Sequence, residues 1–468
     1  MLSLGARMPR PSPLWILCFL SVSFLGVGKA HADDVVPPGT ELPPTLSLDE
    51  ALRIFRNRGL DLLIAEAATR SAEGTVKIAG AIPNPVFNAS VGNSFTYSTS
   101  KASLANCLQN GAVCSPWANT LSISDSAAIE DTLSGKRDLR LTVARNALAA
   151  AKMSRVDAER TIAFQVKSAY VQVALATLNQ KFARDVAESQ TTTLKKFQAR
   201  YAAGAINQSD LARIEVQKLE AEQALSTVGQ TLRQARIALA FLLGVRGAVP
   251  DFDVETKLLD YSVPAGLQSA TETALLRTAF DRRPDLLGSG YLLRQAEAQI
   301  QLVKRQRIPD ITLSLGYAFG GFGGYSTNGP IQGNVLTVGL SFPIPVFYGL
   351  DGELRQAGAQ YDANALQRAK MTAQVASDVS AAFAAFTTSR ELVERMEGPR
   401  REGGGLLTSA RSAFELVGIQ YDKGAASLTD YLDALRTYIA AKTEYFGDLA
   451  TYRTAVFQLE AAVAKELR

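Results

Sequence analysis

The sequence has a single histidine, three cysteines and two tryptophans among its 468 residues. The histidine, His31, lies inside the N-terminal segment that we expect to be removed on export. A mature chain without imidazole cannot build His-based zinc or copper sites, nor use histidine as a general base. The sequence also has no GxSxG motif and no cluster of metal ligands, so we expect neither an enzyme nor a bound cofactor.

The N-terminal segment has the three parts of a secretory signal. Two arginines precede an apolar run at residues 14–27, and an A-x-A motif ends at Ala32. We therefore expect residues 1–32 to be a cleaved signal peptide, with an uncleaved anchor as the alternative. Cys18 follows Leu17, where a lipoprotein signal needs a small residue, so we expect no lipid anchor.

Net charge and long apolar runs are both scarce in the rest of the chain. Cleavage would remove Arg7, Arg10 and Lys29 and no acid, which lowers the net charge from +4 to +1. A nearly neutral chain has no basic surplus for nucleic acid, so we expect no such partner. No continuous apolar run of about 20 residues follows the signal, which excludes a helical membrane protein.

Two cysteines remain after the signal, Cys107 and Cys114, with six residues between them. Their spacing is not that of a CxxC motif, and no histidine or further cysteine completes a metal site. In an exported protein the simplest interpretation is one local disulfide that closes a loop. Two free thiols are the alternative.

Period-2 alternation predicts four strands in two pairs. In the run at 311–319 large apolar side chains alternate with small or polar ones, and the run at 334–345 does the same. Alternation also predicts a strand at about 86–97, and weaker alternation predicts one at about 119–129. Strands of roughly 9–11 residues, apolar on one face and small on the other, are what a membrane-spanning β-barrel requires. A soluble hairpin with one face on a core is the alternative.

Long helical patterns flank the strands. Residues 136–200 contain neither proline nor glycine, and a helix of that length would extend about 100 Å. Apolar positions, many of them alanine, recur there at 3-4 spacing, which is typical of packing along a seam. The pattern breaks at Gly204, and a second helix runs from about 208 to 243, so we expect a long helical hairpin.

The second half of the chain repeats the order of the first. Each copy reads helix, strand, strand, long helix, glycine turn, helix, and Gly424 matches Gly204 at an offset of 220 residues. The expected domains are a Pro-rich segment at 33–45, the first repeat at 46–243, a linker at 244–268 and the second repeat at 269–468. The expected fold class is mixed, mainly α with membrane β. Four strands cannot close a barrel, and open edges in lipid are costly, so the membrane interpretation requires self-association.

Several segments together carry a family resemblance. They are the repeat itself, RRPDL at 282–286, the IPD that ends at 310 and leads into a strand, and SFPIPVFYGLDGELRQA at 341–357. This combination resembles the TolC family of outer-membrane efflux channels over nearly all of the mature chain. The last segment, together with PNPVF at 83–87, most resembles the heavy-metal cation branch of the cobalt–zinc–cadmium type.

The resemblance implies a homotrimer in the lipid of a Gram-negative outer membrane. Three chains would form a 12-stranded β-barrel, continued by an α-helical barrel across the periplasm. The glycine turns would lie at the periplasmic tip and contact an adaptor protein, which couples the channel to an inner-membrane pump. The channel would be a passive conduit, with metal cations as the first expected cargo. Multidrug efflux and type I secretion are alternatives, and a soluble periplasmic coiled-coil scaffold is the alternative from a different class.

The expected gate residues lie beside the glycine turns. Asp430 and Asp433 are three residues apart and share one helix face. The family carries acidic tip rings at these positions, with Asp210 corresponding in the first repeat, so the resemblance implies carboxylates that attract cations. The alternative is that these acids only stabilise helix N-termini. Tyr421 matches a family position that helps to hold the closed tip, but the usual basic partner position is Ala426 here.

The turn residues are the expected adaptor contacts. They are Gly204 and Ala205 in the first repeat, and Gly424 and Ala425 in the second. Glycine at a helix C-terminus accepts left-handed backbone geometry, so turn formation by itself is a sufficient reason for both glycines. The two interpretations are compatible.

Overall fold

The computed structural model describes residues 39, 41–93, 117–319, 325–326, 329–330, 334–398 and 404–467. Contacts divide the chain into two units, Met1–Gly39 and Thr40–Arg468, and every element below belongs to the second unit. The predicted signal peptide at 1–32 and both Cys107 and Cys114 lie outside the described residues. Signal cleavage and the disulfide therefore stay predictions.

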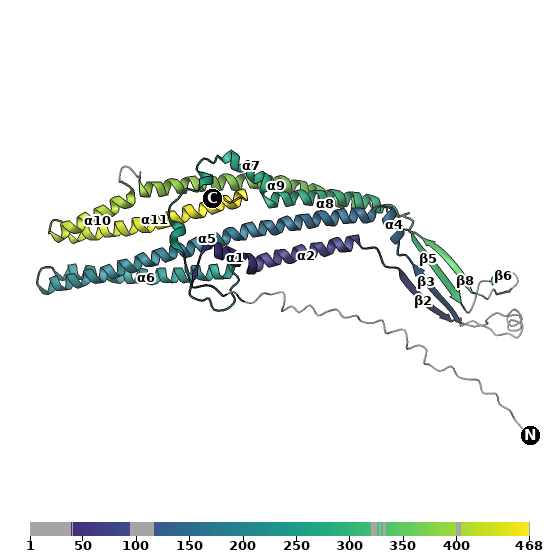
Figure 1. Ribbon diagram of the computed structural model, residues 1–468, viewed down its shortest axis with the longest axis horizontal. Coiled ribbons are helices and arrows are strands. Elements are labelled where there is room, and N and C mark those ends of the chain that lie inside the picture. Colours follow the sequence, from purple (N-terminus) through teal and green to yellow (C-terminus); the bar gives the residue numbers. More distant parts are fainter. Residues whose placement is uncertain are drawn as a thin grey trace, which may run out of the picture. The chain divides into compact units, whose positions relative to one another are not determined.

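The first half of this unit combines long helices with a pair of strands (Figure 1). Its elements are β1 (Thr45–Leu46), α1 (Leu48–Arg58), α2 (Leu60–Gly80), β2 (Val86–Asn93), β3 (Trp117–Ser124), α4 (Ala128–Leu133), α5 (Lys136–Ala202) and α6 (Gln208–Leu242).

The second half has the same order after a short connection. The connection holds β4 (Asp253–Val254) and the 3₁₀ turns η3 (Thr256–Leu259) and η4 (Ala265–Leu267). The elements that follow are α7 (Glu272–Arg282), α8 (Pro284–Gln306), β5 (Thr312–Phe319), β6 (Tyr325–Ser326), β7 (Gly329–Pro330), β8 (Val335–Ser341), α9 (Asp351–Glu397), α10 (Leu406–Asp422) and α11 (Leu428–Val463).

Two of the predicted strands end earlier than the alternation suggested. β3 stops at Ser124 and does not reach 129, because the chain turns into α4 there. The carboxylate of Asp125 holds this turn by accepting the backbone N–H of Leu313 at 2.9 Å. β8 stops at Ser341 and does not reach 345, because the prolines at 343 and 345 have no N–H for a strand ladder.

The four long strands form one antiparallel sheet in the order β2-β3-β5-β8. Leu121 of β3 lies opposite Tyr317 of β5, and Leu315 of β5 lies opposite Val338 of β8. This register places the large side chains of neighbouring strands on one face. Because β2 and β8 end the sheet, each has one edge without a strand partner among the described residues.

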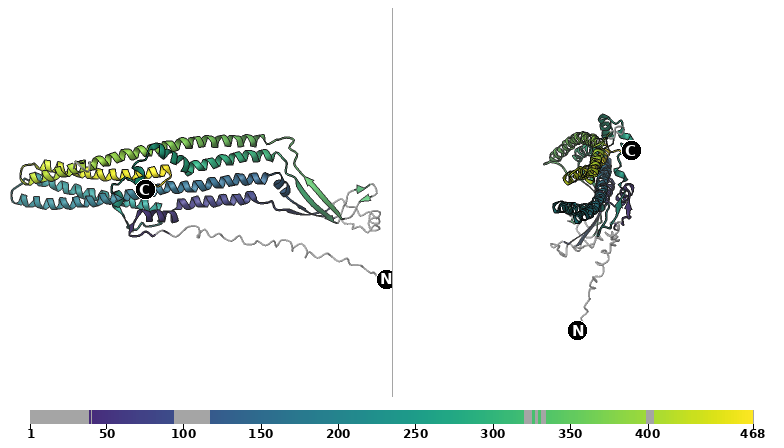
Figure 2. Two further views of the ribbon diagram at one scale, coloured as in Figure 1. Left: turned by 45° about the horizontal axis from the view of Figure 1, so that its top comes forward. Right: turned by 90° about the vertical axis from the view of Figure 1, so that its left-hand side faces the viewer.

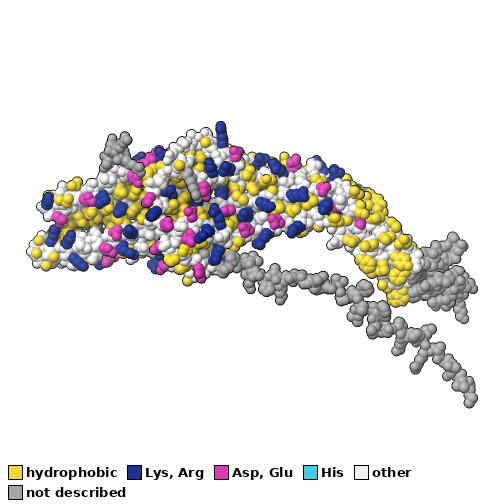
Figure 3. All heavy atoms as spheres, in the orientation of Figure 1, with side chains coloured by type: hydrophobic (Ala, Val, Ile, Leu, Met, Phe, Trp, Pro, Cys, Tyr) yellow, Lys and Arg dark blue, Asp and Glu magenta, His cyan; other side chains and the backbone are white. Residues whose placement is uncertain are grey.

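The apolar face of this sheet is exposed. Phe87, Leu315 and Val338 expose 65%, 47% and 71% of their surface. Figure 3 shows hydrophobic side chains gathered over this end of the unit. The sheet therefore does not pack on a core of its own unit, and the soluble-hairpin interpretation is wrong for it.

The helix α5 is the centre of the helical part. It packs against α2, α6, α8 and α11, while α9 packs against α8 and α11 (Figure 2). Small residues permit this approach: a Cβ added to Gly288 of α8 would lie 3.3 Å from the Cβ of Met153 on α5. Within the described part of the chain, no helix combines the length and apolar character needed to cross a membrane.

The two repeats differ in their long helices. α5 runs without interruption for 67 residues. The corresponding path in the second repeat is divided into α9, which ends at Glu397, and α10, which begins at Leu406. Gly398 lies at the break with φ +76°, a conformation that glycine adopts without steric cost.

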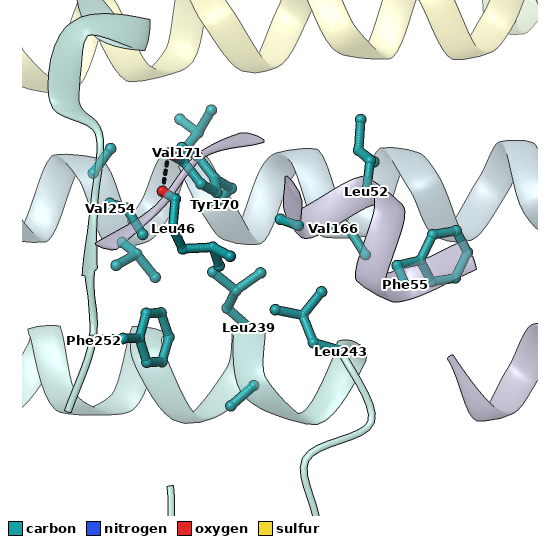
Figure 4. Close-up of a cluster of buried hydrophobic side chains, with 14 of the residues drawn as sticks. Leu46, Leu52, Phe55, Val166, Tyr170, Val171, Leu239, Leu243, Phe252 and Val254 are labelled. Carbon is teal, nitrogen blue, oxygen red and sulfur yellow. Dashed lines mark hydrogen bonds between the residues drawn. The ribbon is translucent and has the colours of Figure 1, made fainter. Parts of the chain in front are cut away.

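A buried cluster joins the N-terminal elements to α5 and α6 (Figure 4). Tyr170 of α5 is fully buried, and its hydroxyl donates to the carbonyl of Leu46 at 2.8 Å and accepts the N–H of Glu255 at 3.0 Å. Burial raises the pKa of Tyr170 to about 12, so the hydroxyl keeps its proton at neutral pH. This side chain thereby ties the paired strands β1 and β4 to the central helix.

The RRPDL motif has a structural role in the second repeat. Arg283 is 3% exposed, and its guanidinium donates to Asp285 at 2.6 Å and to Asp378 of α9 at 2.8 Å. Burial opposes ionisation of Asp285, but the Arg283 hydrogen bonds and charge outweigh it and lower the pKa of that carboxyl. The motif thus fixes the start of α8 to the middle of α9.

Replacing Tyr170 by phenylalanine should lower the stability of the protein. The Tyr170→Phe variant removes the buried hydroxyl from the Leu46 carbonyl and the Glu255 N–H and leaves them only their mutual 3.4 Å hydrogen bond, at a cost of about 1–3 kcal/mol. We expect a fall in the apparent melting temperature of the purified protein, measured by circular dichroism. Tyr201→Phe is the matched control, because Tyr201 is 43% exposed. Equal melting of the two variants would contradict the assigned role.

Candidate functional site

The two helical hairpins, α5–α6 and α10–α11, each end in a turn of the same type. Gly204 has φ +73° and Gly424 has φ +74°, the left-handed conformation that favours glycine. The N–H of Ala205 donates to the carbonyl of Arg200 at 2.9 Å, and the N–H of Ala425 donates to that of Gln420 at 2.8 Å. These are the hydrogen bonds of a Schellman motif, which ends a helix and reverses the chain. Both predicted turns are present, and their four turn residues are exposed.

Two of the predicted acids lie in the first turns of helices, and one of them uses its carboxylate in the cap. The side chain of Asn207 accepts the N–H of Asp210 at 2.8 Å at the start of α6. At the start of α11 the carboxylate of Asp430 accepts the N–H of Ser427 at 3.0 Å and its hydroxyl at 2.7 Å. These hydrogen bonds lower the pKa of Asp430, so its carboxylate stays charged in mild acid. The capping interpretation therefore holds for Asp430, whose exposed side chain also faces solvent.

Asp433 has different surroundings. It is exposed one turn further along α11 and lines a surface groove of about 540 Å³ between α11 and α6. Arg213 of α6 and Arg436 line the same groove. Arg213 also donates to the hydroxyl of Thr429 at 3.2 Å, which joins the first turns of the two helices. The structure thus places Asp433 near Arg436, which helix periodicity within α11 already indicates, and near Arg213 of α6, which it does not.

Tyr421 is held by residues of the first hairpin. Its ring stacks on Phe197 of α5 with centroids 5.8 Å apart and planes 5° from parallel. The guanidinium of Arg200 lies 5.8 Å from the Tyr421 ring centroid and pairs with Asp422 at 3.1 Å. Burial raises the pKa of Tyr421, and the charge of Arg200 opposes that rise. We call Phe197, Arg200, Tyr421 and Asp422 the tip clasp.

A small apolar cluster lies behind the tip clasp. Its buried members are Phe197 and Ile214 from the first hairpin and Leu428 and Leu432 from the second. This contact and the tip clasp join the two hairpins at their ends. A column of aromatic rings continues away from the tip, from Tyr421 through Tyr431, Phe414 and Tyr438 to Phe182, with neighbouring centroids 5.6–6.3 Å apart.

Sequence reasoning missed Arg200 and Phe197. Position 426 is alanine, where the resemblance implies a basic residue. The sequence therefore did not indicate which cation holds Tyr421. Lys423 does not do so, because it is exposed and has no ion pair with any residue that the structure describes. The available signal was the i, i+3 spacing of Phe197 and Arg200 in the last turns of α5, which places an aromatic and a cation on one helix face.

The described residues contain no group of three or more His, Cys, Asp or Glu side chains placed to hold a metal ion. Of the three tip acids, Asp430 uses its carboxylate in a helix cap, whereas the exposed Asp433 side chain lines the groove between α11 and α6 and Asp210 is exposed at the start of α6. The arrangement presents negative charge at the hairpin ends, and the contacts between the two hairpins there are few enough to break.

The sequence matches the protein family described as Outer membrane efflux protein over residues 52–245 and 275–465. It is 25% identical over 452 residues to the cobalt-zinc-cadmium resistance protein CzcC of Cupriavidus metallidurans, covering 93% of this chain and 96% of that protein. It is 25% identical over 454 residues to the pyoverdine export outer membrane protein OpmQ of Pseudomonas aeruginosa, covering 94% and 90%.

The outer membrane protein VceC from Vibrio cholerae has a similar fold. Its crystal structure superposes with a TM-score of 0.67 at 19% sequence identity, covering 90% of this chain and 97% of that one. At this identity the similarity concerns the fold alone.

Shortening Phe197 should loosen the contact between the hairpin ends. Phe197→Ala removes a side chain that is 4% exposed and stacked on Tyr421, and buried Phe→Ala changes cost about 3–5 kcal/mol. We expect faster hydrogen–deuterium exchange of backbone amides in the last turns of α5 and α10 and the first turns of α6 and α11. Phe241→Ala, at a position 73% exposed, is the control. Unchanged exchange at the tip would show that the stack contributes nothing to its stability.

Proposed function

This chain belongs to the outer membrane efflux protein family, and we propose that three copies form a passive conduit for metal cations. The family match spans both halves of the chain, so the predicted family and outer-membrane location are confirmed. Family members are the outer-membrane channels of tripartite efflux systems, in which an adaptor and an inner-membrane pump also take part. The soluble-scaffold alternative is thereby set aside.

The trimer is proposed from the sheet. Four strands with an exposed apolar face and open edges at β2 and β8 cannot remain alone in lipid, where each unpaired backbone group is costly. Joining β8 of one chain to β2 of the next would satisfy both edges, and three chains of four strands would close a 12-stranded barrel. This exposed sheet is the observation that carries the proposal of a membrane conduit.

The adaptor contact is proposed at the hairpin turns. Gly204, Ala205, Gly424 and Ala425 are exposed, lie at the ends of the hairpins and present small side chains that permit close approach by a partner. An inner-membrane pump would then supply the energy through the adaptor, while this chain supplies the passage. We also propose cleavage of the signal peptide at 1–32 and a Cys107–Cys114 disulfide, from their sequence patterns.

Metal cations are the proposed cargo. The support is the similarity to a cobalt-zinc-cadmium resistance protein over nearly the full length of both chains, together with exposed carboxylates at the hairpin tips. Multidrug and protein cargo stay alternatives, and the similarity to a pyoverdine export protein supports export of a small organic molecule as the second candidate. Cargo choice would belong mainly to the pump, because no metal cluster lies in the described part of this chain.

The tip is proposed as the gate. In the trimer, three copies of Asp430 and Asp433, with Asp210 nearby, would surround the narrow end and favour entry of cations. The tip clasp would hold each chain's hairpins together, so that opening requires Arg200 to leave Tyr421 and Asp422. The clasp is weak enough to be reversible, because its ion pair is partly exposed to solvent.

Removing the tip carboxylates should reduce cation preference. We expect the double variant Asp430→Ala, Asp433→Ala to shift the cation-to-anion permeability ratio towards one in planar bilayers, because two acids per chain are lost from the constriction. Because its hydrogen bonds lower the pKa of Asp430, the contribution of this carboxylate to the preference should persist in mild acid and fall only at strongly acidic pH. Asp362→Ala, at an exposed position on α9, is the control. Unchanged selectivity in verified trimers would remove these carboxylates from the gate.

Removing Arg200 should favour the open tip. Arg200→Ala loses the ion pair to Asp422 and the contact with the Tyr421 ring, which together contribute about 1 kcal/mol at this partly exposed site. That energy corresponds to about a fivefold rise in the ratio of open to closed tips per chain. We expect a higher mean single-channel conductance than in the wild type. Arg184→Ala, an exposed arginine on the same helix, is the control.

A charge reversal distinguishes the effect of losing the ion pair from the effect of a general loss of packing at the tip. Arg200→Asp alone should open the tip further, because it places a carboxylate beside Asp422. Combining Arg200→Asp with Asp422→Arg should restore part of the wild-type conductance. If the paired exchange restores nothing, the ion pair does not help to hold the tip.

A further inference from the structure

The helix α4 has the opposite polarity from an ordinary surface helix. Its acidic side chains are buried, since the Glu130 side chain is 10% exposed and Asp131 is 6% exposed. Its large apolar side chains are exposed, Ile129 by 54% and Leu133 by 82%. Because these two lie four residues apart, they share one face of the helix. A surface helix in water places acids outside and large apolar side chains inside, so α4 is inverted.

Ion pairs with the start of α5 hold the acids of α4 inside. The ammonium of Lys136, which is itself buried, lies 3.2 Å from the Glu130 carboxylate. The guanidinium of Arg140 donates to Asp131 at 2.6 Å. The Lys136 ammonium also lies 2.6 Å from Asp310, in the segment that leads into β5. Buried carboxylates need such partners, so the apolar face of α4 cannot turn inward unless these contacts break.

The second repeat has an exposed apolar segment at the corresponding place. α4 lies in the connection from β3 to α5, and residues 342–350 connect β8 to α9. In this second connection Val346 is 70% exposed and Phe347 is 100% exposed. A polar group is again bonded to the following helix, since the hydroxyl of Tyr348 donates to Glu353 of α9 at 2.6 Å. Both repeats therefore expose apolar side chains here and keep neighbouring polar groups paired.

The two connections leave the sheet at the same end. Ser124 at the end of β3 pairs with Ser314 of β5, and Ser341 at the end of β8 pairs with Thr312. Both connections therefore start where β5 begins. Figure 1 shows α4 there, between the strands and the long helices. The exposed apolar surface of the sheet thus continues past the strand ends.

We propose that Ile129 and Leu133 of α4, together with Val346 and Phe347, lie against phospholipid acyl chains in the membrane leaflet nearer the helices. We call these four residues the lipid collar. An apolar medium explains the inversion of α4, because such a medium favours apolar side chains outside and requires charged groups to be paired inside. The proposal rests on the membrane placement of the sheet and extends the lipid contact to residues outside the strands.

A neighbouring copy of the chain is a poorer occupant for the α4 part of the lipid collar. Copies would join at β2 and β8, the outer strands of the sheet. α4 follows β3, an inner strand, and its ion pair with Asp310 ties it to the start of β5, the other inner strand. The exposed face of α4 therefore belongs to the middle of the chain's own sheet.

Quenching of tryptophan fluorescence by brominated lipid tests the placement. Trp117 is the tryptophan outside the predicted signal peptide, so Trp117→Phe is the background. Leu133→Trp and Phe347→Trp would be added singly, and each purified protein would be reconstituted into phosphatidylcholine vesicles with or without bromine near the headgroup end of one acyl chain. We expect both to lose fluorescence in brominated vesicles, as should Leu313→Trp on the exposed face of β5. Ile237→Trp, at a position 55% exposed on α6, should lose none.

The Leu313→Trp control separates this inference from the proposed conduit. If it is quenched but Leu133→Trp or Phe347→Trp is not, the sheet lies in lipid and the lipid collar is wrong. If it is not quenched either, the sheet does not lie in lipid and both proposals fail. Acrylamide in the buffer identifies the other positions. A side chain in the water-filled passage would be quenched by acrylamide and not by brominated lipid, and one buried against a neighbouring copy by neither. Either result overturns the proposal.

Discussion

The exposed edges of the β-sheet are the constraint on which the rest of the molecule depends. Lipid offers no hydrogen bonds, and β2 and β8 each have an edge without a strand partner among the described residues, so the proposed membrane assembly pairs them with strands of neighbouring chains. The outward apolar face adds a second reason, since it has no core of its own unit to cover it. Assembly is thus a condition for placing this sheet in a membrane. The helices would then have to pack against helices of neighbouring chains as well as against one another.

The helical part connects this sheet to the tip through one central element. Because α5 contacts both its own hairpin partner α6 and the second repeat's α8 and α11, the two repeats share one packed body. Buried anchors such as Tyr170 and Arg283 join short segments to that body at its middle. The hairpin ends lack comparable anchors. They are joined by a small apolar cluster, the partly exposed tip clasp and the exposed Arg213–Thr429 hydrogen bond.

This difference in packing suits a device that opens at one end. Contacts at the tip are few, aromatic or charged, and close to solvent, so they can be broken singly. Further from the tip, α5 and α11 are joined by the edge contact between Phe182 and Tyr438 and by Lys442 over the Phe182 ring.

The sequence by itself determined the local features of this protein. Alternation located the sheet, the absence of proline and glycine predicted the uninterrupted α5, and Gly204 and Gly424 marked both turns, because each depends on neighbours along the chain. Strand ends were less predictable, since Asp125 ends β3 through a contact with Leu313 on another strand. Only the tertiary structure decided that Arg200 holds Tyr421, that Asp433 lies near Arg213, and that Phe197 stacks on Tyr421. These relations join residues on different helices, and no periodicity within one helix contains them.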